Sequence, residues 1–326
     1  MFYTKKEFLW VFAILVLLFS GKITEANDSY WQDNELILDT QNNIQFNQGN
    51  VEESNNGIIH LVWNDETENK IIYMRKNYNL SQPIVLSTEN QNPSFPRIDV
   101  SGNKIYVVYQ ARVNNEWTPR LYFTKSLDSG LTWSNPIQVS EENRPSFYPD
   151  ITSDHNLLYI ISATRIYEYN YEIDVYKSDN NDWIRDSNVE ITGNNPRIAA
   201  ENGRIHIVWS EMGNCSISYK RGINHGNNIL YDAEHILNNY YGCGQMPEID
   251  VKSNNLHVIW NDIQNQEYPG MGDIFYSKSE NNGITWTNPI SLTQEHRTVI
   301  SNLHSIKINK NPNVISVAWS DNRNFN

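Results

Sequence analysis

Two segments of this chain are near copies of each other: SLDSGLTWSNPIQVS (residues 126–140) and SENNGITWTNPISLT (residues 279–293). Both follow the pattern Ser-x-[Asp/Asn]-x-Gly-x-Thr-Trp-x-Asn-Pro-Ile. A self-match of this length within one chain indicates a repeat architecture. Their starting points, residues 126 and 279, are too far apart for a single repeat unit, so further copies should lie between them.

A second marker supplies those copies, an apolar run that ends in an aromatic residue and a polar pair. It reads HLVWND, YVVYQA, HIVWSE, HVIWND and SVAWSD, with YIISAT as a weaker sixth member. Its aromatic position, or the serine that replaces it, falls at Trp63, Tyr109, Ser162, Trp209, Trp260 and Trp319. The average spacing is about 51 residues, so the sequence predicts six repeats.

Each repeat shows the same order of strand signals. A short alternating segment after a proline, such as FPRIDV, is followed by a polar turn and then the aromatic-ended run. A third segment such as RLYFTKS and a fourth such as NPIQVS complete the unit. Short β-branched and aromatic runs bounded by Gly, Asn, Pro and Ser predict antiparallel strands. We therefore expect an all-β fold, a six-bladed β-propeller with four-stranded antiparallel blades.

The sixth blade departs from this plan, because the chain ends at Asn326 before a third strand of the last repeat. Residues 30–40, YWQDNELILDT, are similar to the fourth strands of other repeats. We expect this N-terminal strand to close the sixth blade, which would be incomplete at the C-terminus.

The N-terminus has the composition of a secretory signal peptide. Lys5 and Lys6 precede an apolar run over residues 8–19, and Ala26 offers a small residue at a cleavage point. We expect residues 1–26 to be a signal peptide and residues 27–326 to form one β-propeller domain. The protein would then be secreted, with no membrane span after cleavage.

The net charge and the cysteine content argue against nucleic-acid binding and against a metal site. The net charge of -13, without a basic run, argues against nucleic acid as a partner. No His or third Cys stands at ligand spacing from Cys215 and Cys243, so we expect no metal and no cofactor. In an oxidising compartment the two cysteines can form a disulfide, or they can be two unrelated thiols.

The duplicated segments resemble the Asp box, or BNR repeat, of the sialidase (neuraminidase) superfamily. The match consists of Ser126, Asp128, Gly130 and Trp133 in one copy and of Ser279, Asn281, Gly283 and Trp286 in the other. Glycine suits a turn with positive φ, and the Ser and Asp side chains can bond the backbone of the turn itself. These residues are therefore assigned structural roles. The resemblance implies that they lie on the rim remote from any catalytic face.

At the opposite mouth, aligning the repeats brings six positions to the start of successive first strands. They are Asn50, Arg97, Asp150, Arg197, Glu248 and Ser305. We call this set the channel ring, and its alternating Arg and acid residues make it the candidate site.

The resemblance implies three arginines that clamp a substrate carboxylate, a tyrosine nucleophile assisted by a glutamate, and an aspartate acid/base. Arg97 and Arg197 would be two clamps, with Arg112 or Arg165 as the third. Asp150 would be the acid/base, and Glu248 or Glu211 would support the tyrosine. The sequence departs from the family here, because it reads Pro-Arg-Ile where catalytic members read Arg-Ile-Pro.

Two interpretations follow. In the first, the protein is a monomeric, extracellular module that binds a glycan or a protein without catalysis, and the ring is a set of salt bridges. In the second, it is an exo-α-sialidase-type glycoside hydrolase acting on terminal acidic sugars. Trp117, in the segment VNNEWTPR, is explained by neither the repeat nor the ring.

Overall fold

The computed structural model describes most of the chain between residues 46 and 320. The described ranges are 46–77, 79–114, 116–167, 170–178, 182–226, 228–238, 243–262, 272–293, 302–308 and 315–320. The predicted signal peptide, the predicted N-terminal strand at residues 30–40 and the C-terminal residues 321–326 lie outside these ranges.

The described residues form strands and no α-helix, and the strands assemble into antiparallel sheets in sequence order. Blade 1 is β1–β4 (Phe46–Glu53, Ile59–Asp65, Lys70–Lys76, Ile84–Val85) and blade 2 is β5–β8 (Gln91–Ser101, Lys104–Val113, Arg120–Ser126, Ile137–Gln138). Blade 3 is β9–β12 (Ser146–Asp154, Leu157–Tyr167, Asn170–Ser178, Ile184–Asp186) and blade 4 is β13–β17 (Asn194–Glu201, Arg204–Ser210, Ile217–His225, Asn228–Tyr231, His235–Ile236). Blade 5 is β18–β21 (Gly244–Lys252, Asn255–Asp262, Asp273–Ser279, Ile290–Ser291), and β22 (Asn302–Ile308) pairs with β23 (Ile315–Ser320).

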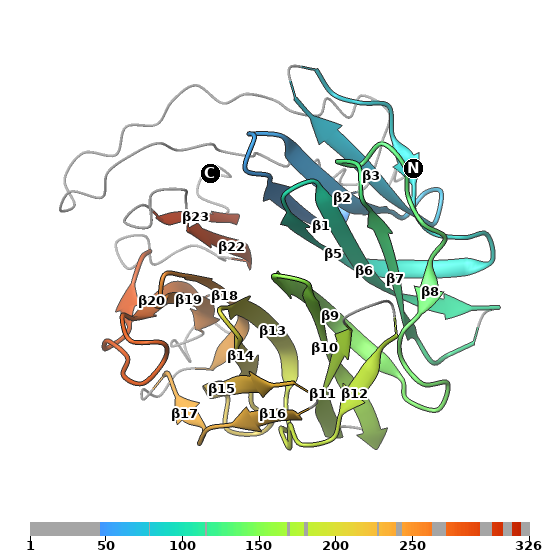
Figure 1. The fold of residues 1–326 in the computed structure, drawn as a ribbon. Coiled ribbons are helices and arrows are strands. Elements are labelled where there is room, and N and C mark those ends of the chain that lie inside the picture. Colours follow the sequence, from blue (N-terminus) through green and yellow to red (C-terminus); the bar gives the residue numbers. More distant parts are fainter. Residues whose placement is uncertain are drawn as a thin grey trace, which may run out of the picture.

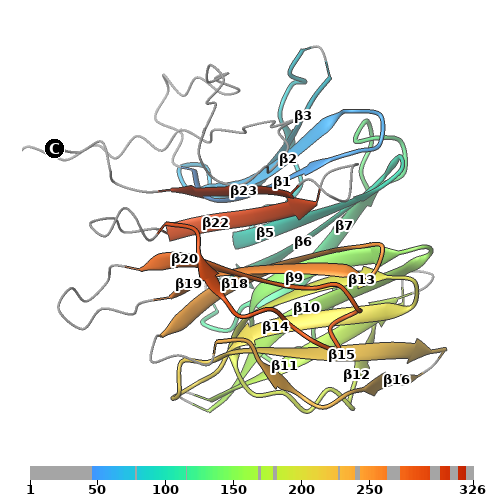
Figure 2. The same cartoon turned by 90° about the vertical axis from the view of Figure 1, so that its left-hand side faces the viewer.

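The blades are arranged around a central axis, as a β-propeller requires. Figure 1 looks along that axis, with the first strand of each sheet innermost and the short fourth strands outermost. Figure 2, turned by 90°, shows the first strands running along the axis. The described residues include no helix long and apolar enough to cross a membrane.

The expected count of six four-stranded blades is wrong for the described residues, which form five complete blades. In place of a sixth, β22 and β23 form a two-stranded sheet. Residues 1–45, 309–314 and 321–326 lie outside the described ranges, so the strands described for the sixth repeat are β22 and β23. The four-stranded antiparallel pattern itself is confirmed in the other blades.

The core lies between neighbouring blades, because the second and third strands of each blade are apolar on both faces. Between blades 1 and 2, Tyr73 and Val62 pack with Ile98, Val107 and Tyr109. The corresponding layer between blades 4 and 5 centres on Trp260, Tyr219 and Val258. Burial of both sheet faces in this way explains why the runs are nearly continuous in hydrophobicity.

The two Ser-Gly-Trp turns (residues 126–133 and 279–286) connect third strands to fourth strands and join adjacent blades. Gly130 has φ of 81°, and a Cβ there would overlap the hydroxyl of Tyr73 in the preceding blade. Trp133 packs edge-on against the same tyrosine at 4.7 Å between ring centroids. The Tyr73 hydroxyl in turn lies 2.7 Å from Nδ1 of buried His60.

The second turn repeats this arrangement between blades 4 and 5. A Cβ on Gly283 would overlap the Tyr219 hydroxyl, and Trp286 packs against Tyr219 at 4.8 Å. Tyr219 lies 2.8 Å from His206 Nδ1. The recurring His and Tyr of the second and third strands thus serve interblade packing.

The opposite rim carries a β-bulge at the start of the first strand in blades 2 to 5. The bulge residue precedes a proline and has positive φ: 51° at Phe95, 53° at Tyr148, 49° at Asn195 and 51° at Met246. The pairing register shifts at the same places. Positive φ is strained for residues other than glycine and is concentrated at functional positions in proteins.

Candidate functional site in the central channel

Three charged members of the channel ring meet in the structure. Arg97 donates from an Nη to Glu248 Oε1 at 2.8 Å, and Arg197 donates from Nε to the same oxygen at 2.8 Å. The side chains are largely buried, with exposed fractions of 18%, 11% and 17% for Arg97, Arg197 and Glu248. The two arginines that the sequence placed in one ring therefore converge, and a carboxylate of the protein already lies between them.

Asp150 lies close enough to this cluster to affect its ionisation. Burial acts to lower the pKa of Arg97, but Glu248 and Asp150 outweigh it and raise that pKa. Burial also raises the pKa of Asp150, against the opposing effect of Arg97 and Arg197. The Asp150 carboxylate additionally accepts the Ile198 N–H at 3.0 Å, which ties blade 3 to blade 4.

Asn50 connects blades 1 and 2 in the same way. Its Oδ1 accepts the Ile98 N–H at 2.9 Å and so links β1 to β5. Ser305, at the equivalent position of β22, is exposed. The ring thus combines contacts between first strands with a compact Arg–Glu–Arg cluster.

The remaining parts of a sialidase-type site do not join this cluster in the described residues. Arg165 lies over the ring of Phe147 at 5.7 Å in blade 3. Arg112 is exposed on β6. Tyr148 stands two residues before Asp150 on β9, and burial, followed by Tyr171, raises its pKa. A nucleophilic tyrosine needs a lowered pKa, so this shift is in the wrong direction.

Glu211, the alternative partner for a tyrosine, instead belongs to a second carboxyl pair. Burial acts to raise the pKa of Glu211, but hydrogen bonds to Glu234, Ser218 and Asn214 lower it. Burial and the bond to Glu211 raise the pKa of Glu234. These two carboxyl groups thus affect each other's pKa and are not members of the channel ring.

A second charged layer lies two residues further along the first strands and was missed by the sequence reasoning. Lys307 Nζ lies 2.9 Å from Glu52 and 3.9 Å from Asp250. Asp99 accepts the Ser153 hydroxyl at 2.5 Å. Burial, with contributions from Asp99 and Asp250, raises the pKa of Glu52 to about 7 although Lys307 opposes the shift. The same repeat alignment, advanced by two residues, would have found this layer.

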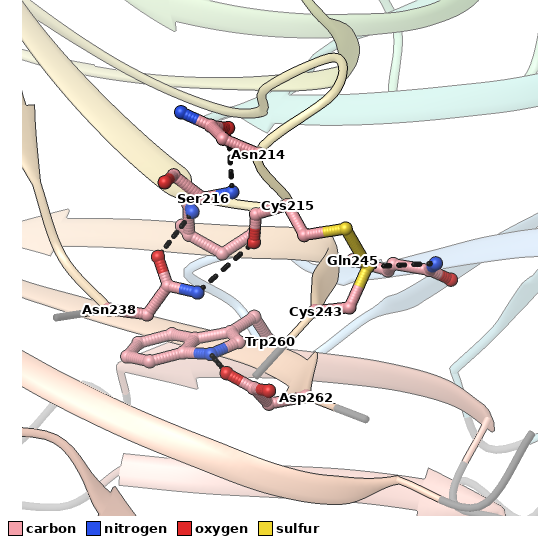
Figure 3. Close-up of a disulfide and its surroundings, with 9 residues drawn as sticks. Asn214, Cys215, Ser216, Asn238, Cys243, Gln245, Trp260 and Asp262 are labelled. Atoms are coloured by element: carbon pink, nitrogen blue, oxygen red, sulfur yellow. Dashed lines mark hydrogen bonds between the residues drawn. A yellow bond between two sulfur atoms is a disulfide. The ribbon is translucent and has the colours of Figure 1, made fainter. Parts of the chain in front are cut away.

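A disulfide between Cys215 and Cys243 lies between blades 4 and 5, with their Cα atoms 4.4 Å apart (Figure 3). Asn238 accepts the Ile217 N–H at 2.6 Å and donates to the Cys215 carbonyl at 3.2 Å. Beside it, Trp260 donates to Asp262 at 3.2 Å. Cys243, directly before β18, is thereby linked to Cys215, two residues before β15.

Comparison with solved structures places this arrangement in a known fold. A mutant of Trypanosoma rangeli sialidase displaying trans-sialidase activity superimposes with a TM-score of 0.60 and 12% identity, over 86% of this chain and 52% of that one. The fold is a sialidase-like β-propeller. The intramolecular trans-sialidase from Ruminococcus gnavus matches with a TM-score of 0.60 and 10% identity, covering 83% of this chain and 89% of that one.

The NanB sialidase from Streptococcus pneumoniae gives the same TM-score, 0.60, at 10% identity, with coverages of 87% and 67%. The sialidase-like propeller spans about half the length of the Trypanosoma rangeli sialidases that it matches. No protein-family model and no curated protein matches the sequence.

Proposed function

We propose that this protein is a secreted sialidase-like propeller that binds a glycan or an extracellular protein and does not hydrolyse it. The observation that supports this proposal is the position of Glu248, whose Oε1 accepts hydrogen bonds from both Arg97 and Arg197. An arginine clamp recognises a carboxylate through free, forked donors. Here the protein's own carboxylate takes that place, so a substrate carboxylate would have to displace it.

In this proposal six blades close the ring. The β22–β23 pair would be the inner half of a sixth blade, and residues 30–40 would supply its outer strand. The ion pair of Lys307 with Glu52 supports closure at this seam, because it connects the last described blade element to the first.

A sialidase-type hydrolase is the second candidate, and the likeness of the fold to three sialidases favours it. A fluorogenic sialoside assay on the secreted chain distinguishes the two. We expect no turnover above background. Turnover that is lost in both Arg97→Ala and Arg197→Ala would overturn the binding proposal and establish the hydrolase.

The binding of free sialic acid to wild type and to Glu248→Gln, measured by isothermal titration calorimetry, tests the structural reason. If Glu248 is what prevents carboxylate binding, its amide should weaken competition for the arginines, and the affinity for a free sialic acid should rise. Circular dichroism of each variant serves as the control for folding.

A further inference from the structure

An open pocket of about 510 Å³ lies between blades 1 and 2, outside the channel ring. It is lined by Asn64, Glu66, Asn69, Asn92, Pro93 and Ser94. These residues come from the end of β2, the β2–β3 turn and the beginning of β5. The volume falls within the usual range for a small-molecule site.

Asn64 brings an unsatisfied hydrogen-bond acceptor to this pocket. Its side chain lines the pocket and the residue is only 5% exposed, yet its Oδ1 has no hydrogen-bond partner among the described residues. A buried polar atom without a partner is costly and calls for an explanation. A ligand hydroxyl at the wall of the pocket would satisfy the amide.

The equivalent position in blade 2 shows why the side-chain oxygen of Asn64 has no hydrogen-bond partner in the described part of the chain. Gln110 follows Tyr109 as Asn64 follows Trp63, and its Oε1 accepts the Tyr148 N–H at 2.8 Å. Gln110 therefore bridges blade 2 to the bulge of blade 3. Asn64 is one methylene shorter, and its oxygen stays unpaired beside the pocket.

Most of the charged groups around the pocket are acidic, which disfavours acidic ligands. Glu66 is part of the lining. The hydrogen bond that Lys70 donates to Glu68 raises the pKa of Lys70, and the charges of Glu68, Asp65 and Glu89 add to this effect. Lys70 is itself paired with Glu68 at 2.8 Å. The lining that the structure describes offers amide, hydroxyl and carboxylate groups and includes no Lys or Arg, which suits a ligand rich in neutral hydroxyl groups.

An exposed aromatic residue lies at the same end of blade 2. Trp117 is 83% exposed on the connection from β6 to β7. That connection leaves the end of β6 at which Arg112 pairs with Asn92 of the pocket. An indole face in this position can stack on a sugar ring, which explains a residue that the repeat does not account for.

We infer that the pocket between blades 1 and 2 binds a neutral saccharide, with Asn64 accepting a sugar hydroxyl and Trp117 stacking on a neighbouring ring. This inference rests on the binding role proposed above and assigns it a site and a ligand class. The ligand class differs from the acidic sugars of the hydrolase candidate.

The test is binding of the full secreted chain to immobilised neutral hexasaccharides of glucose, mannose, galactose and xylose, with 3′-sialyllactose as the acidic probe. We expect measurable binding to at least one neutral probe and none to 3′-sialyllactose. Asn64→Gln, which gives this position the length with which Gln110 reaches the next blade, should weaken binding about tenfold. Trp117→Ala, which removes an exposed side chain, should weaken binding as well.

Gln110→Asn is the matched control, since it makes the reciprocal change outside the pocket and should leave binding unchanged. Absence of binding to every neutral probe, preference for 3′-sialyllactose, or equal affinity of wild type, Asn64→Gln and Trp117→Ala would each overturn the inference. These outcomes are separate from sialoside hydrolysis, which alone would overturn the proposed function.

Discussion

The two rims of the propeller use positive φ in opposite ways. On one rim the strained positions are the Ser-Gly-Trp turns, whose side chains bond back to their own backbone and pack on the preceding blade. On the other rim they are bulges that carry different residues in each blade: Phe95, Tyr148, Asn195 and Met246. Repetition with identical chemistry indicates a structural role of the side chains, whereas the bulges repeat a backbone conformation and let the side chain vary from blade to blade.

Substituting Gly130 should produce the largest effect. Gly130→Ala places a Cβ on the Tyr73 hydroxyl and forces alanine to φ of 81°. We expect a loss of about 3 kcal/mol in the free energy of unfolding, measured by urea denaturation. Gly102→Ala is the control, because Gly102 also has positive φ, 65°, but has open space around it. It should cost only about 1 kcal/mol, and equal losses would show that packing on Tyr73 is unimportant.

Breaking the Arg–Glu–Arg cluster should come next. Glu248→Gln leaves Arg97 and Arg197 partly buried without their shared carboxylate, and we expect a loss of about 2 kcal/mol by the same measurement. The matched control is Glu68→Gln, which removes an exposed ion pair with Lys70 and should have no measurable effect. If Glu248→Gln is equally silent, the channel ring is not a structural cluster.

The raised pKa of Glu52, in the second charged layer, predicts that the free energy of unfolding decreases as the pH rises. The pKa of Glu52 is raised to about 7 in the folded protein, from an ordinary value of 4.5, so the folded state holds the proton more tightly. The resulting stabilisation is fully present below pH 4.5 and is lost as the pH rises through 7. Compared with Glu52→Gln, the wild type should lose about 2 kcal/mol between pH 4.5 and 8.

Urea midpoints of wild type and Glu52→Gln at several pH values provide this measurement. The exposed neighbour Glu53, substituted in the same way, controls for the loss of a negative charge. A constant difference between wild type and Glu52→Gln across the range would contradict the buried position of this carboxyl group.

Asp128→Asn should have the smallest effect, because the second turn already carries asparagine. Asn281 accepts the Thr285 N–H at 2.9 Å and donates to the Thr285 hydroxyl at 2.8 Å. Asp128 makes the corresponding contacts with Thr132. The hydrogen bonds from Thr132 lower the pKa of Asp128 to about 2, so any advantage of aspartate should vanish as the pH falls from 3.8 to 2. A urea midpoint lowered as far as in Gly130→Ala would show that the turn depends on charge.

The sequence predicted the architecture well where the repeats agree. The aromatic-ended runs fall on the second strands of their blades, and the alignment of first strands correctly brought Arg97, Arg197 and Glu248 together. It could not give the partner of each side chain, because a guanidinium aimed at a substrate and one aimed at Glu248 occupy the same sequence position. Among the described residues five blades are complete, and the sixth repeat contributes only β22 and β23.

The pocket was beyond this kind of prediction for a similar reason. Asn64 and Gln110 align, and both are polar amides, so the pattern treats them as one position. The difference of one methylene matters only after the distance between neighbouring blades is known. Comparing side-chain length across aligned positions would have given the signal.

The disulfide keeps the chain in one piece when a protease cleaves it between the two cysteines. Cys215 and Cys243 are 28 residues apart, and the segment between them contains β15, β16 and β17, the outer half of blade 4. A protease that cleaves one peptide bond in that segment leaves both fragments covalently attached. The nicked protein would therefore migrate as one species until a reducing agent is added, and blade 4 would retain its contacts with blade 5 meanwhile.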